Sequence, residues 1–180
     1  MRVGFAQTTF SPNVRRMPLC QVQTDSDIAR VAELGQRIWT EHYTPILAEG
    51  QVPYMLEHVH SAAIIRSEIT TGGYNYHLIK DGTGEAVGYL GFVNEGDAIF
   101  LSKVYLLASA RGTGLGREAL DFVRLCAEEL GCRTIRLGVN KGNASAIAAY
   151  QRVGFRITGE MVNDIGGGFV MDDYAMEWAI

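Results

Sequence analysis

The sequence predicts a mixed α/β domain with a central mixed sheet of about seven strands and about four helices. Residues 100–107 form an apolar, β-prone run that leads into a glycine-rich turn, an amphipathic helix and a second apolar run at 134–139. Two buried strands joined by a helix predict a parallel pair with a right-handed crossover. Upstream, the turn residues Asp81-Gly82-Thr83-Gly84 separate two β-prone runs, which predicts an antiparallel hairpin that leads into this unit.

Local signals place the other elements along the chain. Thr24 opens an acidic cluster typical of a helix start, and Pro45 predicts the end of that helix. Asn143 is a natural N-cap for an alanine-rich helix, which Gly154 ends. The predicted elements are a strand at 19–23, a helix at 24–43, a helical region at 49–66 that holds one helix or two short ones, strands at 74–80 and 85–93, helices at 115–130 and 144–152, and strands starting at 155 and 169.

Length and composition indicate one globular domain. A chain of 180 residues, 47% of them hydrophobic, has enough apolar material for its own core. Residues 1–16 mix Gly, Thr, Ser, Pro and Arg without a period, so we expect a flexible leader followed by a single domain at 17–180. Met17 is an alternative natural start.

Charge and cysteine content exclude several classes of protein. A net charge of −4 gives no reason to expect nucleic-acid binding and suits a cationic partner slightly better than an anionic one. The three cysteines, Cys20, Cys126 and Cys132, lack the spacing of a disulfide framework or a metal site and read as reduced thiols. No apolar run reaches the roughly twenty residues of a membrane span. We therefore expect a cytoplasmic protein that uses neither a metal nor a membrane.

The turn Arg111-Gly112-Thr113-Gly114-Leu115-Gly116 has the chemistry of a diphosphate site. It places free backbone N–H groups at a helix N-terminus, where the helix dipole adds partial positive charge. Glycine allows the backbone to approach an anion closely, and Arg111 adds a full positive charge. The turn departs from a Walker loop because Gly116 is followed by Arg117-Glu118, and the third glycine comes one residue too early for a dinucleotide fingerprint. A glycine turn that binds nothing remains the alternative.

This turn resembles the Arg-x-x-Gly-x-Gly pyrophosphate loop of the GNAT (GCN5-related N-acetyltransferase) superfamily, which binds acetyl-coenzyme A. A second pattern agrees with it: Asn143, Ala146, Tyr150, Gly154 and Phe155 stand as Asn-x-x-Ala-x-x-x-Tyr-x-x-x-Gly-Phe. Asn143 and Tyr150 are seven residues apart and share one helix face. The two patterns cover about residues 100 to 156. Taken alone, Tyr150 would read as a phenol of the core.

The resemblance implies a fold, a co-substrate and roles for site residues. Acetyl-coenzyme A would lie in a V-shaped gap between the strand carrying Leu106 and the strand ending at Val139. The N–H of Leu106 would polarise the thioester carbonyl. The amides of residues 112–116 and Arg111 would hold the pyrophosphate, and Asn143 would contact the coenzyme arm. Tyr150 would protonate the departing thiolate after direct attack by an amine.

The general base is left open because the chain departs from the family pattern. Lys103 and Val104 stand where some relatives carry an acidic base, and Ala108 replaces a frequent proline. The candidates for the base are His42, Glu41, Tyr76, His77 and Glu95, of which we favour His42 because histidine titrates in the useful range. Trp39, Tyr43 and Tyr54 are candidates for the acceptor pocket, and His58 and His60 point to different helix faces and do not suggest a metal pair.

We therefore expect an acetyl-coenzyme A-dependent N-acetyltransferase whose acceptor is a small cationic amine. Two alternatives share the fold: a coenzyme sensor without turnover, and a protein N-terminal acetyltransferase. A third reading is a nucleotide- or dinucleotide-binding enzyme. Oligomeric state cannot be read from the residues, although dimers are common among similar enzymes.

Overall fold

The computed structural model describes residues 19–180, so the predicted leader at 1–16 and the alternative start at Met17 lie outside the described residues. The strands are β1 (Leu19–Gln21), β2 (Asn75–Lys80), β3 (Ala86–Asn94), β4 (Ala98–Leu106), β5 (Thr134–Asn140), β6 (Arg156–Gly166) and β7 (Phe169–Ala179). The helices are α1 (Asp25–Tyr43), α2 (Gln51–His58), α3 (Ala62–Thr70), α4 (Leu115–Glu129) and α5 (Ala144–Val153), with a 3₁₀ turn, η2, at Ala108–Ala110.

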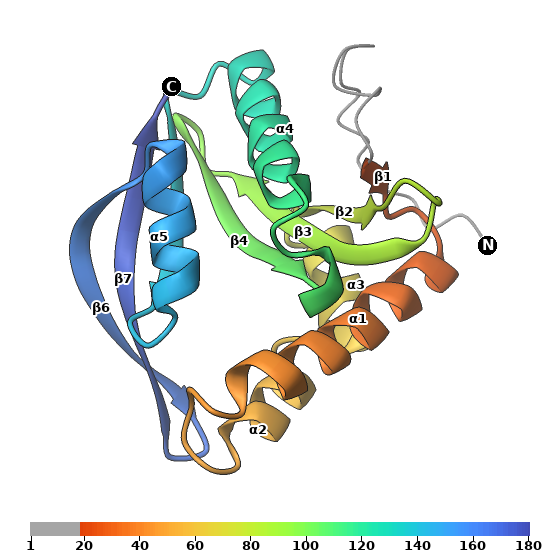
Figure 1. Ribbon diagram of the computed structural model, residues 1–180, viewed down its shortest axis with the longest axis vertical. Helices are drawn as coiled ribbons and strands as arrows, with labels where there is room; N and C mark the ends of the chain where they lie inside the picture. Colours follow the sequence, from red (N-terminus) through yellow and green to blue (C-terminus); the bar gives the residue numbers. More distant parts are fainter. Residues whose placement is uncertain (1–18) are drawn as a thin grey trace.

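The strands form a seven-stranded sheet in the order β1-β2-β3-β4-β5-β7-β6, with helices on both faces (Figure 1). β4 and β5 are parallel and are connected through α4. Every other neighbouring pair in the described sheet is antiparallel. The predicted mixed sheet, the hairpin of β2 and β3 and the parallel pair around α4 are thus confirmed.

Of the two alternatives predicted for residues 49–66, the structure has the two short helices, which brings the described helices to five. The region 49–66 holds two helices, α2 and α3, which meet at a break after His58. Ser61 begins the second helix, because its hydroxyl accepts a hydrogen bond from the Ile64 N–H and so caps the helix start.

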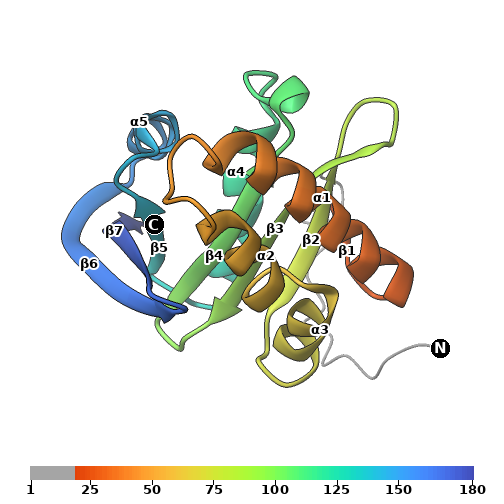
Figure 2. The same cartoon turned by 90° about the horizontal axis from the view of Figure 1, so that it is seen from below.

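Helix α1 covers one face of the sheet together with α3, as seen from below in Figure 2. A capping box fixes its start: the Thr24 hydroxyl accepts from the Asp27 N–H, and the Asp27 carboxylate accepts from the Thr24 N–H. Apolar side chains at helical spacing then turn toward the strands, and the buried ones are Ile28, Val31, Leu34, Ile38 and Trp39. No helix within residues 19–180 is long and apolar enough to cross a membrane.

The opposite face of the sheet is covered by α4 and α5. Phe122, Val123 and Cys126 of α4 are fully or almost fully buried against the strands. Leu101 and Ile135, from the two parallel strands, lie in the same cluster. Burial of these side chains fixes α4 over the β4–β5 pair, and with it the glycine turn that precedes the helix.

The sheet divides between β4 and β5. Their paired positions end at Phe100 and Arg136, while β5 continues to pair with β7 as far as Asn140. A β-bulge in β4 follows that last paired position, since Gly91 pairs with Lys103 while Phe92 pairs with Leu101. Beyond this point β4 runs away from the β6–β7 hairpin (Figure 1). The second half of β4 therefore has an edge that no described strand occupies.

The position of Leu106 at this edge depends on Gly88, the residue that pairs with it on β3. A Cβ at Gly88 would stand 2.4 Å from the Tyr105 carbonyl oxygen and 2.6 Å from a methyl carbon of Leu106. We expect Gly88→Ala to lower the free energy of unfolding by about 1–3 kcal/mol, because the strands must separate to admit the methyl group. Denaturant unfolding measures the change. The matched control is Gly82→Ala, in the β2–β3 turn, where a Cβ would meet no atom within 4 Å; equal losses in the two variants would contradict the close approach.

Candidate active site

A cavity of about 840 Å³ lies at the division between β4 and β5. It extends from the glycine turn, past the end of β4, to α1, α2 and the β6–β7 hairpin. Such a volume suits a small-molecule site with mostly apolar walls and a few polar groups. Its polar lining residues include His42, Lys103, Arg111, Asn143 and Tyr150. Residues from distant parts of the chain thus meet in one cavity.

The glycine turn presents its backbone to this cavity. Gly112 and Gly114 have φ angles of 77° and 99°, which lie in the left-handed region that side chains with a Cβ disfavour. A Cβ at either position would meet no atom within 4 Å, so the space beside them is open. The Thr113 hydroxyl donates to the Ala110 carbonyl at 2.8 Å and holds the turn in shape. Helix α4 begins at Leu115, so the N–H groups of its first turn have no partner inside the helix.

The amide of Leu106 points to the open edge of β4. The neighbouring Leu107 N–H donates to the Val87 carbonyl at 2.9 Å and so faces β3. Because successive N–H groups of a strand face opposite edges, the Leu106 N–H faces away from β3. That is the edge from which β5 has separated. A donor is therefore available where the sequence analysis expects the thioester carbonyl.

Arg111 does not extend freely over the glycine turn. Its Nε donates to the Leu106 carbonyl at 3.1 Å, and its Nη1 lies 3.0 Å from His42 Nδ1. His42 belongs to the end of α1, 69 residues earlier in the chain. The guanidinium thus links the end of β4 to α1 at the mouth of the cavity.

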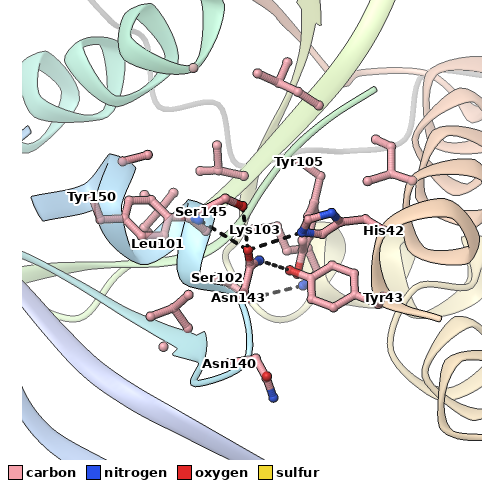
Figure 3. Close-up of a pocket in the computed structure, with 18 of the residues that line it drawn as sticks. His42, Tyr43, Leu101, Ser102, Lys103, Tyr105, Asn140, Asn143, Ser145 and Tyr150 are labelled. Atoms are coloured by element: carbon pink, nitrogen blue, oxygen red, sulfur yellow. Dashed lines mark hydrogen bonds between the residues drawn. The ribbon is translucent and has the colours of Figure 1, made fainter. Parts of the chain in front are cut away.

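His42 continues this link to α5 (Figure 3). Arginine has only donors, so Nδ1 of His42 must accept, and the ring proton then lies on Nε2. Nε2 is 3.2 Å from the Asn143 Oδ1 and donates to it. Partial burial lowers the pKa of His42, and the nearby Arg111 charge lowers it further, while the Asn143 hydrogen bond acts in the opposite direction. In this arrangement His42 is neutral and both of its ring nitrogens are occupied.

Asn143 joins four groups at the start of α5. Its Oδ1 accepts from the Ala146 N–H, as predicted for an N-cap, and also from the Ser145 hydroxyl. Its Nδ2 donates to the Tyr43 hydroxyl at 3.2 Å. Burial raises the pKa of Tyr43 to about 12, so this phenol stays protonated. A chain of contacts thus runs from Arg111 to His42 and on to Asn143 and Tyr43, and its last two steps are visible in Figure 3.

Tyr150 lines the same cavity from α5, two turns beyond Asn143 (Figure 3). Its ring packs edge-on against Phe155, with the ring centroids 5.5 Å apart. Burial is the main cause that raises the pKa of Tyr150, which keeps the phenol in its protonated form. Asn143 and Tyr150 therefore share a helix face, and that face is turned to the cavity.

Of the five candidate bases, His42 alone lines the cavity. The Tyr76 hydroxyl donates to the Glu68 carboxylate in the α1–α3 core, and His77 is buried against Phe122 on the α4 side. Glu95 lies in the exposed turn before β4, and Glu41 is exposed on α1. The structure therefore does not bring Glu41, Tyr76, His77 or Glu95 to the site.

The walls opposite the glycine turn are largely aromatic. Trp39 and Tyr43 line the cavity, with ring centroids 4.2 Å apart, and Tyr105 stands edge-on to Trp39. Tyr54 does not line it, because its hydroxyl instead donates to the Ile165 carbonyl at 2.8 Å. His58 stacks on the outward Tyr54 ring. No group of three or more metal-binding side chains occurs in the part of the chain that the structure describes.

Three further residues line the cavity without a local sequence pattern that marks them as site residues: Lys103, His60 and Asp173. The Lys103 ammonium is buried and bound to the Glu68 carboxylate at 2.9 Å. His60 is buried beside Trp39, and burial lowers its pKa to about 3. Asp173, on β7, also lines the cavity. Alternation along β7 was the available signal, since it places Phe169, Met171 and Asp173 on one face.

Comparisons with known proteins agree with this geometry. The profile of the Acetyltransferase (GNAT) family matches residues 36–155. An uncharacterized N-acetyltransferase of Mycobacterium bovis is 34% identical over 94 residues, which make up 52% of this chain and 60% of that protein. The spermine/spermidine N(1)-acetyltransferase of Bacillus subtilis is 33% identical over 79 residues, which cover 43% of this chain and 51% of that protein. The chain thus matches about half the length of these curated relatives.

Solved structures share the fold at low sequence identity. The PaiA N-acetyltransferase of Thermoplasma acidophilum, in complex with coenzyme A, superimposes with a TM-score of 0.75 at 17% identity, over 90% of this chain and 98% of that one. The ribosomal-protein-S18-alanine N-acetyltransferase of Escherichia coli gives a TM-score of 0.67 at 21% identity, over 90% and 92% of the two chains. These likenesses establish the fold.

The contact between Arg111 and His42 predicts how His42 titrates. The pKa of His42 should lie below the usual value of about 6.5, and Arg111→Gln should raise it, because a nearby positive charge disfavours the imidazolium. Since folding favours neutral His42, its contribution to stability is present above about pH 6.5 and is lost as the pH falls. NMR titration of the imidazole measures the shift. Arg117→Gln, which removes an exposed arginine paired with Asp121, is the control; a His42 pKa that is the same in Arg111→Gln and wild type would disprove the contact.

Proposed function

The chain belongs to the GNAT family of acetyltransferases, and on that premise we propose that it transfers the acetyl group of acetyl-coenzyme A to a small cationic amine. The observation that carries this proposal is the convergence of three groups on one open strand edge. These are the free amides of the glycine turn, the outward-facing N–H of Leu106 and the phenol of Tyr150. Each is a group that the transfer of an acyl group from a coenzyme thioester requires.

The residues present fit the coenzyme as a ligand. The amides at 112–116 bind the diphosphate at the positive end of α4, where the open space beside the glycines leaves room for the phosphate oxygens. Arg111 adds its charge beside them. Asn143, at the start of α5, contacts the coenzyme arm where it runs along the edge of β4. In the structure, Arg111 and Asn143 both contact His42. These contacts lie where the coenzyme arm would enter the gap between β4 and β5.

The reaction follows from these positions. The Leu106 N–H donates to the thioester oxygen and stabilises the negative charge that develops there. The amine attacks the carbonyl carbon in its neutral form, after its ammonium has given a proton to water. A C–N bond forms and the C–S bond breaks, and the second proton that the nitrogen loses passes through water to restore the phenol of Tyr150. Tyr150 donates its proton to the sulfur as the thiolate leaves. Burial raises the pKa of Tyr150 and so keeps its phenol protonated. A thiolate in the same buried place is also disfavoured, so the departing sulfur gains from accepting this proton.

The acceptor is inferred from the walls and from the relatives. Trp39, Tyr43 and Tyr105 offer aromatic faces, which attract organic cations. The relative from Bacillus subtilis is named for spermine and spermidine, and one from Pseudomonas aeruginosa, 31% identical over 94 residues, is named for L-methionine sulfoximine and L-methionine sulfone. A small amine matches the size of the cavity and resembles the molecules for which these relatives are named. A protein N-terminus and a sensor without turnover are the competing readings.

Release of the coenzyme thiol from acetyl-coenzyme A, in the presence of a panel of primary amines, amino acids and N-terminal peptides, tests the function directly. We expect thiol release with at least one small amine and none with the peptides. Binding of acetyl-coenzyme A without thiol release from any acceptor would support the sensor reading instead. Release with peptides alone would support the N-terminal acetyltransferase.

The glycine turn has a matched control elsewhere in the fold. Gly114 and Gly96 have φ angles of 99° and 96°, and neither would bring a Cβ within 4 Å of another atom. Gly114→Val and Gly96→Val therefore impose similar backbone strain, but only the first places a side chain at the proposed diphosphate site. We expect Gly114→Val to weaken coenzyme A binding about tenfold or more in calorimetry. This effect corresponds to the loss of at least one hydrogen bond to a charged group. Similar affinities for the two variants would remove the turn from the site.

Removal of the Tyr150 hydroxyl tests its role as the acid. Tyr150→Phe keeps the ring that packs on Phe155 and should lower kcat about 100-fold while the KM for acetyl-coenzyme A changes little. The control is Tyr174→Phe, a phenol on β7 whose ring lies under the Lys141 ammonium and does not line the cavity. If kcat falls equally in both variants, Tyr150 is not the proton donor.

A further inference from the structure

Asp173 brings a carboxylate to the wall of the cavity that faces α1. It lies in the middle of β7, where it pairs with Asn140 of β5 on one side and with Met161 of β6 on the other. Met171 and Ile165, from the same hairpin, line the cavity beside it. Asn140 marks the end of β5, next to the Asn143 contacts (Figure 3). The carboxylate is thus held by a paired strand and not by a loop.

One oxygen of this carboxylate lacks any partner. Oδ1 of Asp173 is shielded from water and has no hydrogen-bond donor among the described residues. The Asn140 side chain hydrogen-bonds to the Asp173 carboxylate and favours its charged form, but burial acts more strongly and raises the pKa of Asp173. A shielded carboxylate oxygen without a donor is costly, because it has lost the hydrogen bonds that water would make.

No cation among residues 19–180 neutralises Asp173 within the cavity. Lys141 is near enough to influence it, yet its ammonium is bound outside the cavity to Glu160 at 2.7 Å and to Asp172 at 2.5 Å. Asp172 itself adds negative charge beside Asp173. The Tyr43 phenol is near enough for the Asp173 charge to influence its pKa, yet it does not donate to Oδ1. The wall is therefore negatively charged, and none of the described cations is bound to the Asp173 carboxylate.

We propose that Asp173 binds the ammonium group of the acceptor and selects cationic aliphatic amines over neutral or anionic molecules. This inference rests on the proposed function and adds to it the residue that recognises the acceptor. An ammonium in the cavity neutralises the half-buried Asp173 carboxylate, which lines the wall, and the aromatic walls formed by Trp39 and Tyr43 accommodate its alkyl chain and its charge. The acceptor then enters from the α1 side, while the glycine turn binds the other substrate at the opposite end of the cavity.

The position of Asp173 also explains how a chain with Lys103 on β4 can attract an amine. The ammonium of Lys103 is buried and neutralised by Glu68 at 2.9 Å, so it does not repel a cation. His42 is neutral in its contacts with Arg111 and Asn143. Asp173 is therefore the charged side chain of this wall that remains available for an ammonium.

Equilibrium binding of n-hexylamine and 1-hexanol, which have the same length and differ in charge, tests the proposal. Calorimetry is run with and without coenzyme A on wild type, Asp173→Asn and Asp172→Asn. Asp172 is the matched control, since it is the preceding residue on β7, is exposed and forms an ion pair with Lys141 outside the cavity. We expect wild type and Asp172→Asn to prefer hexylamine, and Asp173→Asn to lose about tenfold or more in hexylamine affinity with no change for hexanol. Equal affinities for hexylamine in Asp173→Asn and wild type would overturn the proposal, as would equal binding of the two probes to wild type.

Kinetics and NMR separate this proposal from the proposed function and from a folding defect. With an amine that supports turnover, Asp173→Asn should raise the KM for the amine and leave the KM for acetyl-coenzyme A unchanged. If no amine supports turnover, the proposed function fails, yet the binding measurements still decide the role of Asp173. If Asp173→Asn does not fold, the carboxyl carbon of Asp173 in the wild-type protein should shift on titration with hexylamine and not with hexanol. The absence of that shift would overturn the inference.

Discussion

The separation of β4 from β5 is the constraint on which the candidate site depends. The two strands pair at three positions, from Ala98 with Thr134 to Phe100 with Arg136, and then diverge. Their first part is fixed by the core beneath α4, and the bulge in β4 lies where the divergence begins. A strand that loses its neighbour leaves unpaired donors and acceptors, which would be costly if nothing bound there. The open edge is therefore both a local cost in folding free energy and the place where a ligand with matching polar groups gains most.

A side-chain network takes part of the missing neighbour's place. The Arg111 Nε donates to the Leu106 carbonyl, and the contacts from Arg111 through His42 to Asn143 connect the end of β4 with the start of α5. These side chains give the divided sheet a polar link between its two halves. The same residues line the cavity. A ligand that enters the gap must therefore contact the side chains that link the two halves of the sheet. Structure and proposed chemistry thus depend on one set of contacts.

Local patterns predicted much of the fold and one end of the site. The glycine turn and its helix are contiguous in the sequence, and Asn143 with Tyr150 occupy one helix, so spacing was enough to place each pair. The link from His42 to Asn143 joins residues 101 positions apart, and no periodic signal reports such a contact. Asp173 stands in a strand that reads as ordinary alternation, and its role depends on a charge to which none of the described cations is bound. The sequence left one helix or two open for residues 49–66, and the Ser61 cap, which begins α3, decides for two.

A structure of the complex with acetyl-coenzyme A tests the central claim most directly, because that claim concerns the open edge of β4. The account predicts the diphosphate on the amides at 112–116 and the thioester oxygen within hydrogen-bond distance of the Leu106 N–H. It also predicts that the coenzyme arm lies between β4 and β5. A coenzyme bound elsewhere, with the Leu106 amide unengaged and the gap still closed by His42, would contradict the account.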